Sequence, residues 1–155
     1  MFKPDLRLET AIKFSHFDTS HLLSPASPHP IVLEDENWQT AEHYVQAQLA
    51  GSAGAVERIR KMTSARQAFD FNKPWYRRKK TGWKNQRRLF MTRALYTKVQ
   101  MYEEVRDYLL STGDDYIAET SQYDHYWGIG RDQRGENMLG KVWLDIRARL
   151  LTNQV

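Results

Sequence analysis

Hydrophobic residues recur at helical spacing through much of the second half of the chain. In residues 85–113, and again after Asn137, apolar side chains stand three or four positions apart. That spacing predicts one long helix that Gly113 stops, and a final helix that follows Asn137. The apolar stripe of the long helix is Met91, Leu95, Val99, Tyr102, Val105 and Leu109, and that of the final helix is Leu139, Val142, Trp143, Ile146 and Leu150.

The first half of the chain predicts shorter elements. Residues 31–38 (IVLEDENW) indicate two short strands around a turn, after a proline- and serine-rich stretch at 24–30 that must be extended or turning. Thr40 is a suitable N-cap for a helix that runs to Gly51, with Glu42 in its first turn. We also expect helices over about residues 53–62 and 64–71, a basic loop over 71–83 and a short extended piece over 115–121.

These elements together predict a mostly helical α+β fold. We expect one compact domain over residues 1–155 with a small β-hairpin, since a chain of this length can bury a core without disulfides. No strand–helix–strand alternation is visible, so a doubly wound nucleotide-binding fold is not expected.

The composition places the chain among ordinary globular proteins. It is 41% hydrophobic and 27% charged, and it contains no cysteine. The missing cysteines remove disulfides, thiolate metal sites and cysteine nucleophiles, and they suit a reducing compartment. No apolar run reaches the roughly 18 residues needed to span a bilayer. We therefore expect a soluble, cytoplasmic protein with no membrane partner.

The net charge of +4 is unevenly distributed. Residues 57–93, called the basic segment below, contain thirteen lysines and arginines against two acidic residues, a local excess of +11 that leaves the rest of the chain at −7. Such a segment attracts phosphate-bearing partners, whether nucleotides, sugar phosphates or nucleic acid. The alternative is a solvated basic face that serves solubility alone.

Glu42 and Lys98 are charged residues at positions where helices are expected to be apolar. Glu42, Gln46 and Leu49 fall on one stripe of a segment that is apolar on several sides, and burial would raise the pKa of a carboxyl toward that of a general acid or base. Alternatively, Glu42 caps its own helix and faces water. Lys98 lies on the apolar stripe of the long helix, where most lysines extend their ammonium to the rim; the alternative is a desolvated amine that meets an anion.

A second candidate region is the loop of residues 121–137, SQYDHYWGIGRDQRGEN. It combines two tyrosines, a tryptophan, three glycines, three acidic side chains and an asparagine. Its glycines do not fit the dinucleotide or phosphate-loop fingerprints, the five histidines show no zinc-site spacing, and no G-x-S-x-G elbow is present. Flat rings, a carboxylate and an amide held by tight turns suit a planar heterocycle joined to a sugar. A purely structural loop that buries its own aromatic rings is the alternative.

Three motifs in combination resemble the NADAR family of N-glycosidases. They are E-H-Y-x-Q-A in residues 42–47, D-x-x-W-G-x-G in 124–130 and G-x-N-x-L-G in 135–140, and the likeness covers about residues 22–150. Members of this family hydrolyse the N-glycosidic bond of ribosylaminopyrimidine phosphates, which are early riboflavin-pathway intermediates. Relatives remove ADP-ribose from guanine bases in nucleic acid.

The resemblance implies a metal-independent hydrolase without a cofactor and gives several residues a role. It makes Glu42 and Asp124 the catalytic carboxylates of one pocket. The substrate-binding residues that it implies are Trp127, Asn137, Gln46, Lys98, Glu119, Trp83 and Gly128. Two positions depart from the family pattern: Leu49 stands where a lysine is usual, and Ser24–Ala26 reads SPA where S-N-F is usual. If the usual lysine binds phosphate or takes part in covalent chemistry, this protein must use another cation, act on another substrate or be weakly active.

These residues suggest a mechanism and three classes of function. Cleavage of an N-riboside passes through a cationic sugar. One of Glu42 and Asp124 would stay ionised and orient water while the other stabilises the cation or handles the proton, with Glu42 as the expected base. The expected partner is a small phosphorylated ribosylaminopyrimidine. The alternatives are an ADP-ribosyl-guanine hydrolase acting on modified nucleic acid, and a non-catalytic nucleic-acid-binding module built on residues 73–88. The oligomeric state is left open.

Overall fold

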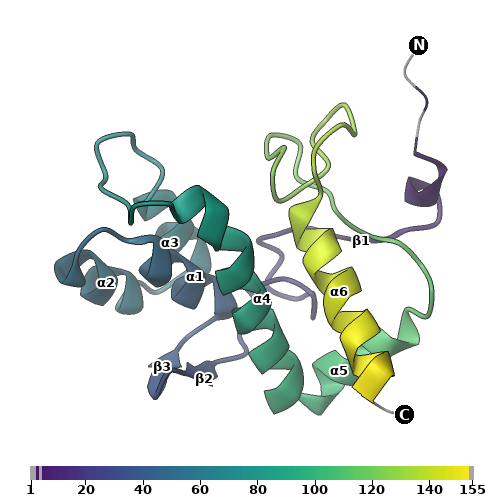
Figure 1. Ribbon diagram of the computed structural model, residues 1–155, viewed down its shortest axis with the longest axis horizontal. Coiled ribbons are helices and arrows are strands. Elements are labelled where there is room, and N and C mark those ends of the chain that lie inside the picture. Colours follow the sequence, from purple (N-terminus) through teal and green to yellow (C-terminus); the bar gives the residue numbers. More distant parts are fainter. Residues whose placement is uncertain (1–2, 4, 154–155) are drawn as a thin grey trace.

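Six helices and four short strands make up the part of the chain that the computed structural model describes, residue 3 and residues 5–153 (Figure 1). A single 3-10 turn at Leu6–Leu8 precedes them. The strands are β1 (Ile12–Phe14), β2 (Ile31–Leu33), β3 (Glu36–Trp38) and β4 (Ile117–Glu119), and the helices are α1 (Ala41–Leu49), α2 (Ala53–Arg60), α3 (Ala65–Phe71), α4 (Trp83–Met101), α5 (Glu103–Ser111) and α6 (Met138–Asn153). The fold is therefore α+β and mostly helical, as the sequence predicts.

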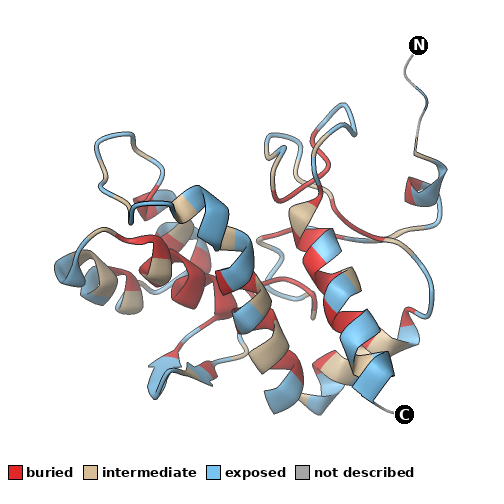
Figure 2. Ribbon diagram, in the orientation of Figure 1, coloured by how far each residue is buried: buried red, intermediate tan, exposed pale blue. Residues whose placement is uncertain are grey.

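Helix α1 is the centre of the structure. It packs against α2, α3 and α4, and α4 packs in turn against α6. Eight of its nine residues are buried, which is why nearly the whole helix is coloured as buried in Figure 2. Tyr44 and Val45 of α1, Leu95 of α4 and Trp143 of α6 belong to one continuous apolar core. Polar side chains on α1 are thus either hydrogen-bonded inside the molecule or turned toward a cavity.

Helix caps explain where three of the helices begin. The hydroxyls of Thr40, Ser52 and Ser64 accept from the backbone N–H three residues later, at the starts of α1, α2 and α3. Each bond satisfies an N–H that has no partner within the helix. The predicted cap at Thr40 is confirmed.

Two separate two-stranded sheets flank the helices. Strands β2 and β3 form the predicted antiparallel hairpin, and Glu34 and Asp35 at its turn both have positive φ angles. Strands β1 and β4 pair in parallel, with Phe14 opposite Glu119. The sequence does not predict this second pairing. It joins segments about a hundred residues apart and brings the residues after β1 next to Glu119.

The predicted long helix is wrong in one respect, because it divides into α4 and α5. Tyr102 leaves the helical conformation, with φ −123° and ψ 103°, and its hydroxyl donates to the Pro30 carbonyl at 2.5 Å. Glu103 and Glu104 then open α5, where acidic side chains suit a helix N-terminus. The apolar spacing continues across the break, so periodicity does not reveal it. Within the described residues, no helix is long and apolar enough to cross a bilayer.

Candidate active site

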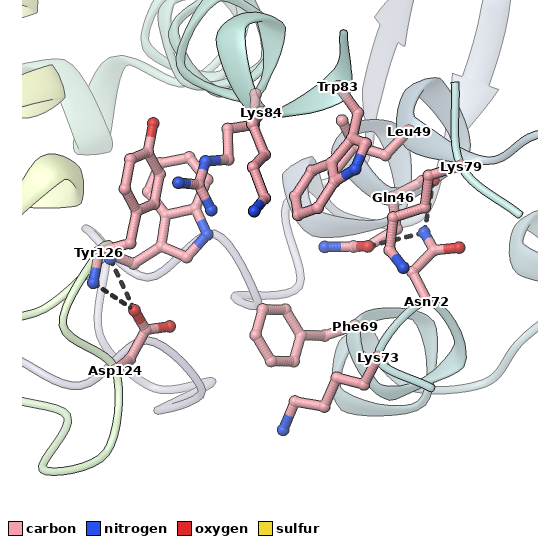
Figure 3. A pocket seen from close by; sticks show the side chains of 12 residues that line it. Gln46, Leu49, Phe69, Asn72, Lys73, Lys79, Trp83, Lys84, Asp124 and Tyr126 are labelled. Carbon is pink, nitrogen blue, oxygen red and sulfur yellow. Dashed lines mark hydrogen bonds between the residues drawn. The ribbon is translucent and has the colours of Figure 1, made fainter. Parts of the chain in front are cut away.

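A hollow of about 390 Å³ opens between helices α1 and α3, the start of α4 and the loop before α6 (Figure 3). Its volume lies in the usual range for small-molecule sites, about 300–1,000 Å³. Asp124 and Tyr126 stand on one side, and Gln46, Asn72 and Trp83 on the other. The complete lining is Gln46, Leu49, Phe69, Asn72, Lys73, Lys79, Trp83, Lys84, Arg87, Asp124, Tyr126 and Trp127.

Four cations of the basic segment line this hollow: Lys73, Lys79, Lys84 and Arg87. The Lys84 side chain reaches between the two walls, and the Arg87 guanidinium lies over the Tyr126 ring. The basic segment is thus not only a solvated face, because part of its charge is directed at a cavity. Anionic groups such as phosphates are the natural ligands of such a cluster.

Asp124 is the carboxylate on the wall of the hollow. Its Oδ1 accepts from the backbone N–H of Tyr126 at 3.0 Å and of Trp127 at 2.7 Å. These bonds fix the turn that carries both aromatic side chains. The other carboxylate oxygen points toward the hollow (Figure 3). Asp124 can therefore stabilise positive charge or orient a water molecule there.

Glu42 lies behind the wall rather than on it. Its side chain has no exposed surface, and its Oε2 is 2.7 Å from Nε2 of His16, which is also buried. Its Oε1 accepts from the amide nitrogen of Gln46 at 2.8 Å, and Gln46 does line the hollow. The expectation that Glu42 is buried is confirmed, whereas direct contact with a ligand would need Gln46 to move.

A buried histidine, His16, lies against Glu42. Burial by itself lowers the pKa of His16, but the Glu42 carboxylate, through its charge and its hydrogen bond, and the charges of Glu119 and Asp124 outweigh that effect. The pKa of His16 is therefore raised above its ordinary value. Its ring also meets those of Phe69 and Trp127 edge-on, with centroids 5.4 and 6.4 Å away.

Glu119 and Asn137 form a buried layer that supports the loop. Glu119 Oε1 accepts from the backbone N–H of His16 at 2.8 Å, and the backbone N–H of Glu119 donates to Asn137 Oδ1 at 2.9 Å. The Asn137 amide also donates to the Ile117 carbonyl at 2.9 Å. Gly128 packs so closely on Glu119 that an added Cβ would lie 2.1 Å from Oε2. These three predicted site residues thus hold the loop instead of lining the hollow.

Lys98 lies apart from the hollow, and the expectation that its ammonium reaches the rim is wrong. The side chain is 1% exposed, and Nζ donates to the carbonyls of Leu22 and Ser24 at 2.6 and 2.9 Å and to the Ser27 hydroxyl at 2.5 Å. Burial lowers the pKa of Lys98 to about 7. The segment of residues 22–27 covers this lysine, which spacing along α4 cannot indicate.

Leu49 lines the hollow at the position where a lysine is usual in the resembled family. Residue 50 bridges to Lys79, and the backbone N–H of Lys80 donates to the Leu49 carbonyl at 2.9 Å. This pairing sets Lys79 on the lining beside Leu49. A cation from the basic segment thus stands next to the position that lacks one.

Sequence reasoning missed several residues of this site. His16, Phe69 and Asn72 carry no motif, and each is joined to the rest by contacts between distant segments: Asn72 Nδ2, for example, donates to Gln46 Oε1 at 2.8 Å. Asn72 is the C-cap of α3, and no local pattern distinguishes it from other polar residues at helix ends. Arg87 lies in the basic segment and Tyr126 in the loop of residues 121–137, but the sequence assigns neither residue a role of its own in the site.

Comparison with known proteins agrees with the motifs. Residues 5–151 match the NADAR domain. An N-glycosidase of Nostoc punctiforme is 32% identical over 127 residues, which cover 80% of this chain and 81% of that protein. The N-glycosidase YbiA of Escherichia coli is 33% identical over 125 residues, covering 78% and 76%. The riboflavin biosynthesis protein PYRR of Zea mays is 30% identical over 155 residues, which are 89% of this chain but 25% of the maize protein.

The fold is also that of a solved relative. The NMR structure of E. coli YbiA superposes with a TM-score of 0.83 at 29% identity, and the match covers 94% of this chain and 87% of YbiA. Sequence motifs, the match along nearly the whole chain and the common fold lead to one conclusion: this chain belongs to the NADAR domain family.

Proposed function

We propose that the chain is an N-glycosidase that hydrolyses the bond between ribose and a pyrimidinone-type base, with a phosphorylated ribosylaminopyrimidine as substrate. One observation carries the proposal: a carboxylate, four aromatic side chains and four cations line the same hollow. An N-riboside phosphate needs each of these, because it presents a planar base, a sugar that becomes cationic and an anionic phosphate. The relatives named as N-glycosidases and as a riboflavin biosynthesis protein support the same class of reaction.

The reaction breaks the bond between the anomeric carbon and nitrogen, and its electron pair leaves with the base. Water supplies the new carbon–oxygen bond, and its proton is balanced by protonation of the departing nitrogen. We assign Asp124 to the sugar, where its hollow-facing oxygen stabilises the cationic transition state and orients the water. The rings of Trp83, Tyr126 and Trp127 provide surfaces on which a flat base stacks.

The cations complete the assignment. We assign Lys79 and Lys84 to the phosphate, since both line the hollow beside Trp83. Lys79 then supplies the cation that the lysine usual at position 49 supplies in the family. Glu42 acts indirectly, through Gln46, because it contacts Gln46 and does not line the hollow. No step in this scheme needs a metal or an organic cofactor.

Substitution of Asp124 by asparagine tests the catalytic assignment. Asparagine keeps an oxygen that accepts from the N–H groups of Tyr126 and Trp127 but loses the charge, so turnover should fall by about 100- to 10,000-fold. The measurement is mass-spectrometric detection of released base and ribose phosphate. Asp132→Asn is the matched control, because Asp132 caps a turn of the same loop through Arg134 N–H and is exposed. Equal turnover in both variants would refute the role of Asp124.

An ADP-ribosyl-guanine hydrolase acting on nucleic acid is the second candidate. Trp75 is 92% exposed and Tyr76 is 66% exposed, and both lie in the basic loop between the lining residues Lys73 and Lys79. Exposed aromatic rings among cations are typical of surfaces that bind single-stranded nucleic acid. If the wild-type protein bound nucleic acid but released no base from either substrate, the non-catalytic binding module would be the better description.

A further inference from the structure

His16 is a buried histidine directly beneath the hollow. It is 1% exposed and follows strand β1, in the segment that the β1–β4 pairing brings next to Glu119. Its ring stacks on Phe17 with centroids 4.2 Å apart and meets the rings of Phe69 and Trp127, both of which line the hollow. Burial of a polar imidazole is costly unless the ring is hydrogen-bonded or paired with a charge.

Acidic groups face His16 from three directions. Glu42 comes from α1, Glu119 from β4 and Asp124 from the loop that follows β4. Glu42 and Glu119 have no exposed surface, so without a compensating cation their charges would be costly to bury. Arg66 and Lys73 lie over the rings of Phe17 and Phe69, and both form ion pairs with Asp70 and not with these carboxylates.

Hydrogen bonds connect His16 to the wall of the hollow. Nε2 of His16 is 2.7 Å from Glu42 Oε2, and Glu42 Oε1 accepts from Gln46 Nε2 at 2.8 Å. Gln46 Oε1 in turn accepts from Asn72 Nδ2 at 2.8 Å. The Gln46 amide thus donates to Glu42 and accepts from Asn72, so these two partners fix its orientation. The second hydrogen of that nitrogen remains for a ligand in the hollow.

We propose that His16 is a positioning residue for glycoside hydrolysis: its imidazole holds the Glu42 carboxylate in place, and Glu42 holds the Gln46 amide nitrogen in place at the hollow. The inference rests on the proposed function for its catalytic consequence, but the charge pair and the orientation of Gln46 can be measured without turnover. Without the imidazole, the Glu42 carboxylate would lose the partner that fixes its Oε2, 2.7 Å away. The Gln46 amide nitrogen, which donates to Oε1 of the same carboxylate, would then be held less firmly.

The kinetic test compares His16→Gln with His43→Gln. His43 is also buried on α1, but its ring contacts the Thr40 hydroxyl and the Met62 carbonyl and no carboxylate. We expect His16→Gln to lower kcat by about 10-fold or more with KM nearly unchanged, and to remove from the pH profile of kcat the inflection that follows the titration of His16. His43→Gln should retain the wild-type pH profile. A wild-type kcat and pH profile in folded His16→Gln would overturn the proposal.

A spectroscopic test applies even if the substrate assignment fails. The imidazole signals of His16 in the wild-type protein should titrate above the ordinary histidine pKa, and Glu42→Gln should lower that pKa while His43→Gln leaves it unchanged. The Gln46 side-chain amide signals should shift in His16→Gln and Glu42→Gln. A His16 pKa that ignores Glu42→Gln would overturn the proposal whatever the enzyme cleaves. Failure to turn over a ribosylaminopyrimidine phosphate, with the paired titration intact, would reject the proposed function instead.

Discussion

At the scale of single residues, the site depends on one glycine that lies against a carboxylate. Glu119 accepts from the backbone of His16 and of Ser121, so its position fixes the start of the loop that carries Asp124. Gly128 leaves room for it: an added Cβ would lie 2.1 Å from Glu119 Oε2 and 3.1 Å from the Asp124 carbonyl. The glycine is needed there for space, and its φ angle is not in the left-handed region.

Gly128→Ala and Gly54→Ala should therefore have opposite effects. The first forces the buried Glu119 carboxylate to move and should lower the free energy of unfolding by about 1–3 kcal/mol. The second places a methyl group on α2 where nothing lies within 4 Å, and it should raise stability by a few tenths of a kcal/mol up to about 1 kcal/mol. Urea denaturation of both variants gives the comparison. Equal stability of Gly128→Ala and the wild type would show that the loop is not packed as described.

At the scale of elements, the segment of residues 22–27 connects three helices. Lys98 of α4 donates to three of its oxygens, the Trp143 indole of α6 donates to the Leu23 carbonyl, and the backbone N–H of Glu42 in α1 donates to the Pro25 carbonyl. The start of α1, and with it Glu42, is held by this segment. Lys98 thus supports the site from a distance and not by contact with a ligand.

Lys98→Met should leave those oxygens without a donor and lower the free energy of unfolding by about 1–3 kcal/mol at neutral pH. Because the folded-state pKa is lowered to about 7, the unfolded state binds more protons above that pH, and wild-type stability should gain from this group as pH rises toward 10. The difference between the wild type and Lys98→Met should therefore grow over that range. Lys141→Met on the exposed face of α6 is the control. A difference that shrinks or stays constant with pH would contradict the burial described for Lys98.

Sequence predicted those elements whose signals are local. The signals for the cap at Thr40 and for the hairpin of residues 31–38 each lie within a few neighbouring positions. The β1–β4 pairing joins two three-residue strands over a hundred positions apart, with no local signal in either. The break at Tyr102 was hidden because the apolar spacing continues into α5.

The site divides in the same way. Asp124, Trp127 and Gln46 belong to recognisable motifs and line the hollow. His16 belongs to no motif. Its role comes from its contact with Glu42 on a different element, and the residues around position 16 contain no pattern that indicates this partner. The second tryptophan of the lining, Trp83, was placed through family resemblance and not through spacing. Residues that act through tertiary contacts are thus the ones that sequence reasoning omits.

At the scale of the whole molecule, charge is divided along the sequence between the basic segment and a net acidic remainder. Part of the basic segment lines the hollow, and the loop with Trp75 and Tyr76 carries further cations beside it. This arrangement attracts anionic substrates and offers more positive charge than one phosphate requires. Binding of a polynucleotide would release many counterions and depend steeply on salt, whereas a small phosphorylated riboside would depend on it weakly.

The most direct measurement is a parallel assay of both glycosides with the wild-type protein and Asp124→Asn, at low and moderate salt, with mass spectrometry of the released base. We expect the wild-type protein to release base from the ribosylaminopyrimidine phosphate at a rate that changes little with salt. The rate for Asp124→Asn should be lower by about 100-fold or more. Release from ADP-ribosylated nucleic acid alone, falling steeply with salt, would contradict the proposed substrate. No release from either glycoside would contradict the proposal that the chain is an N-glycosidase.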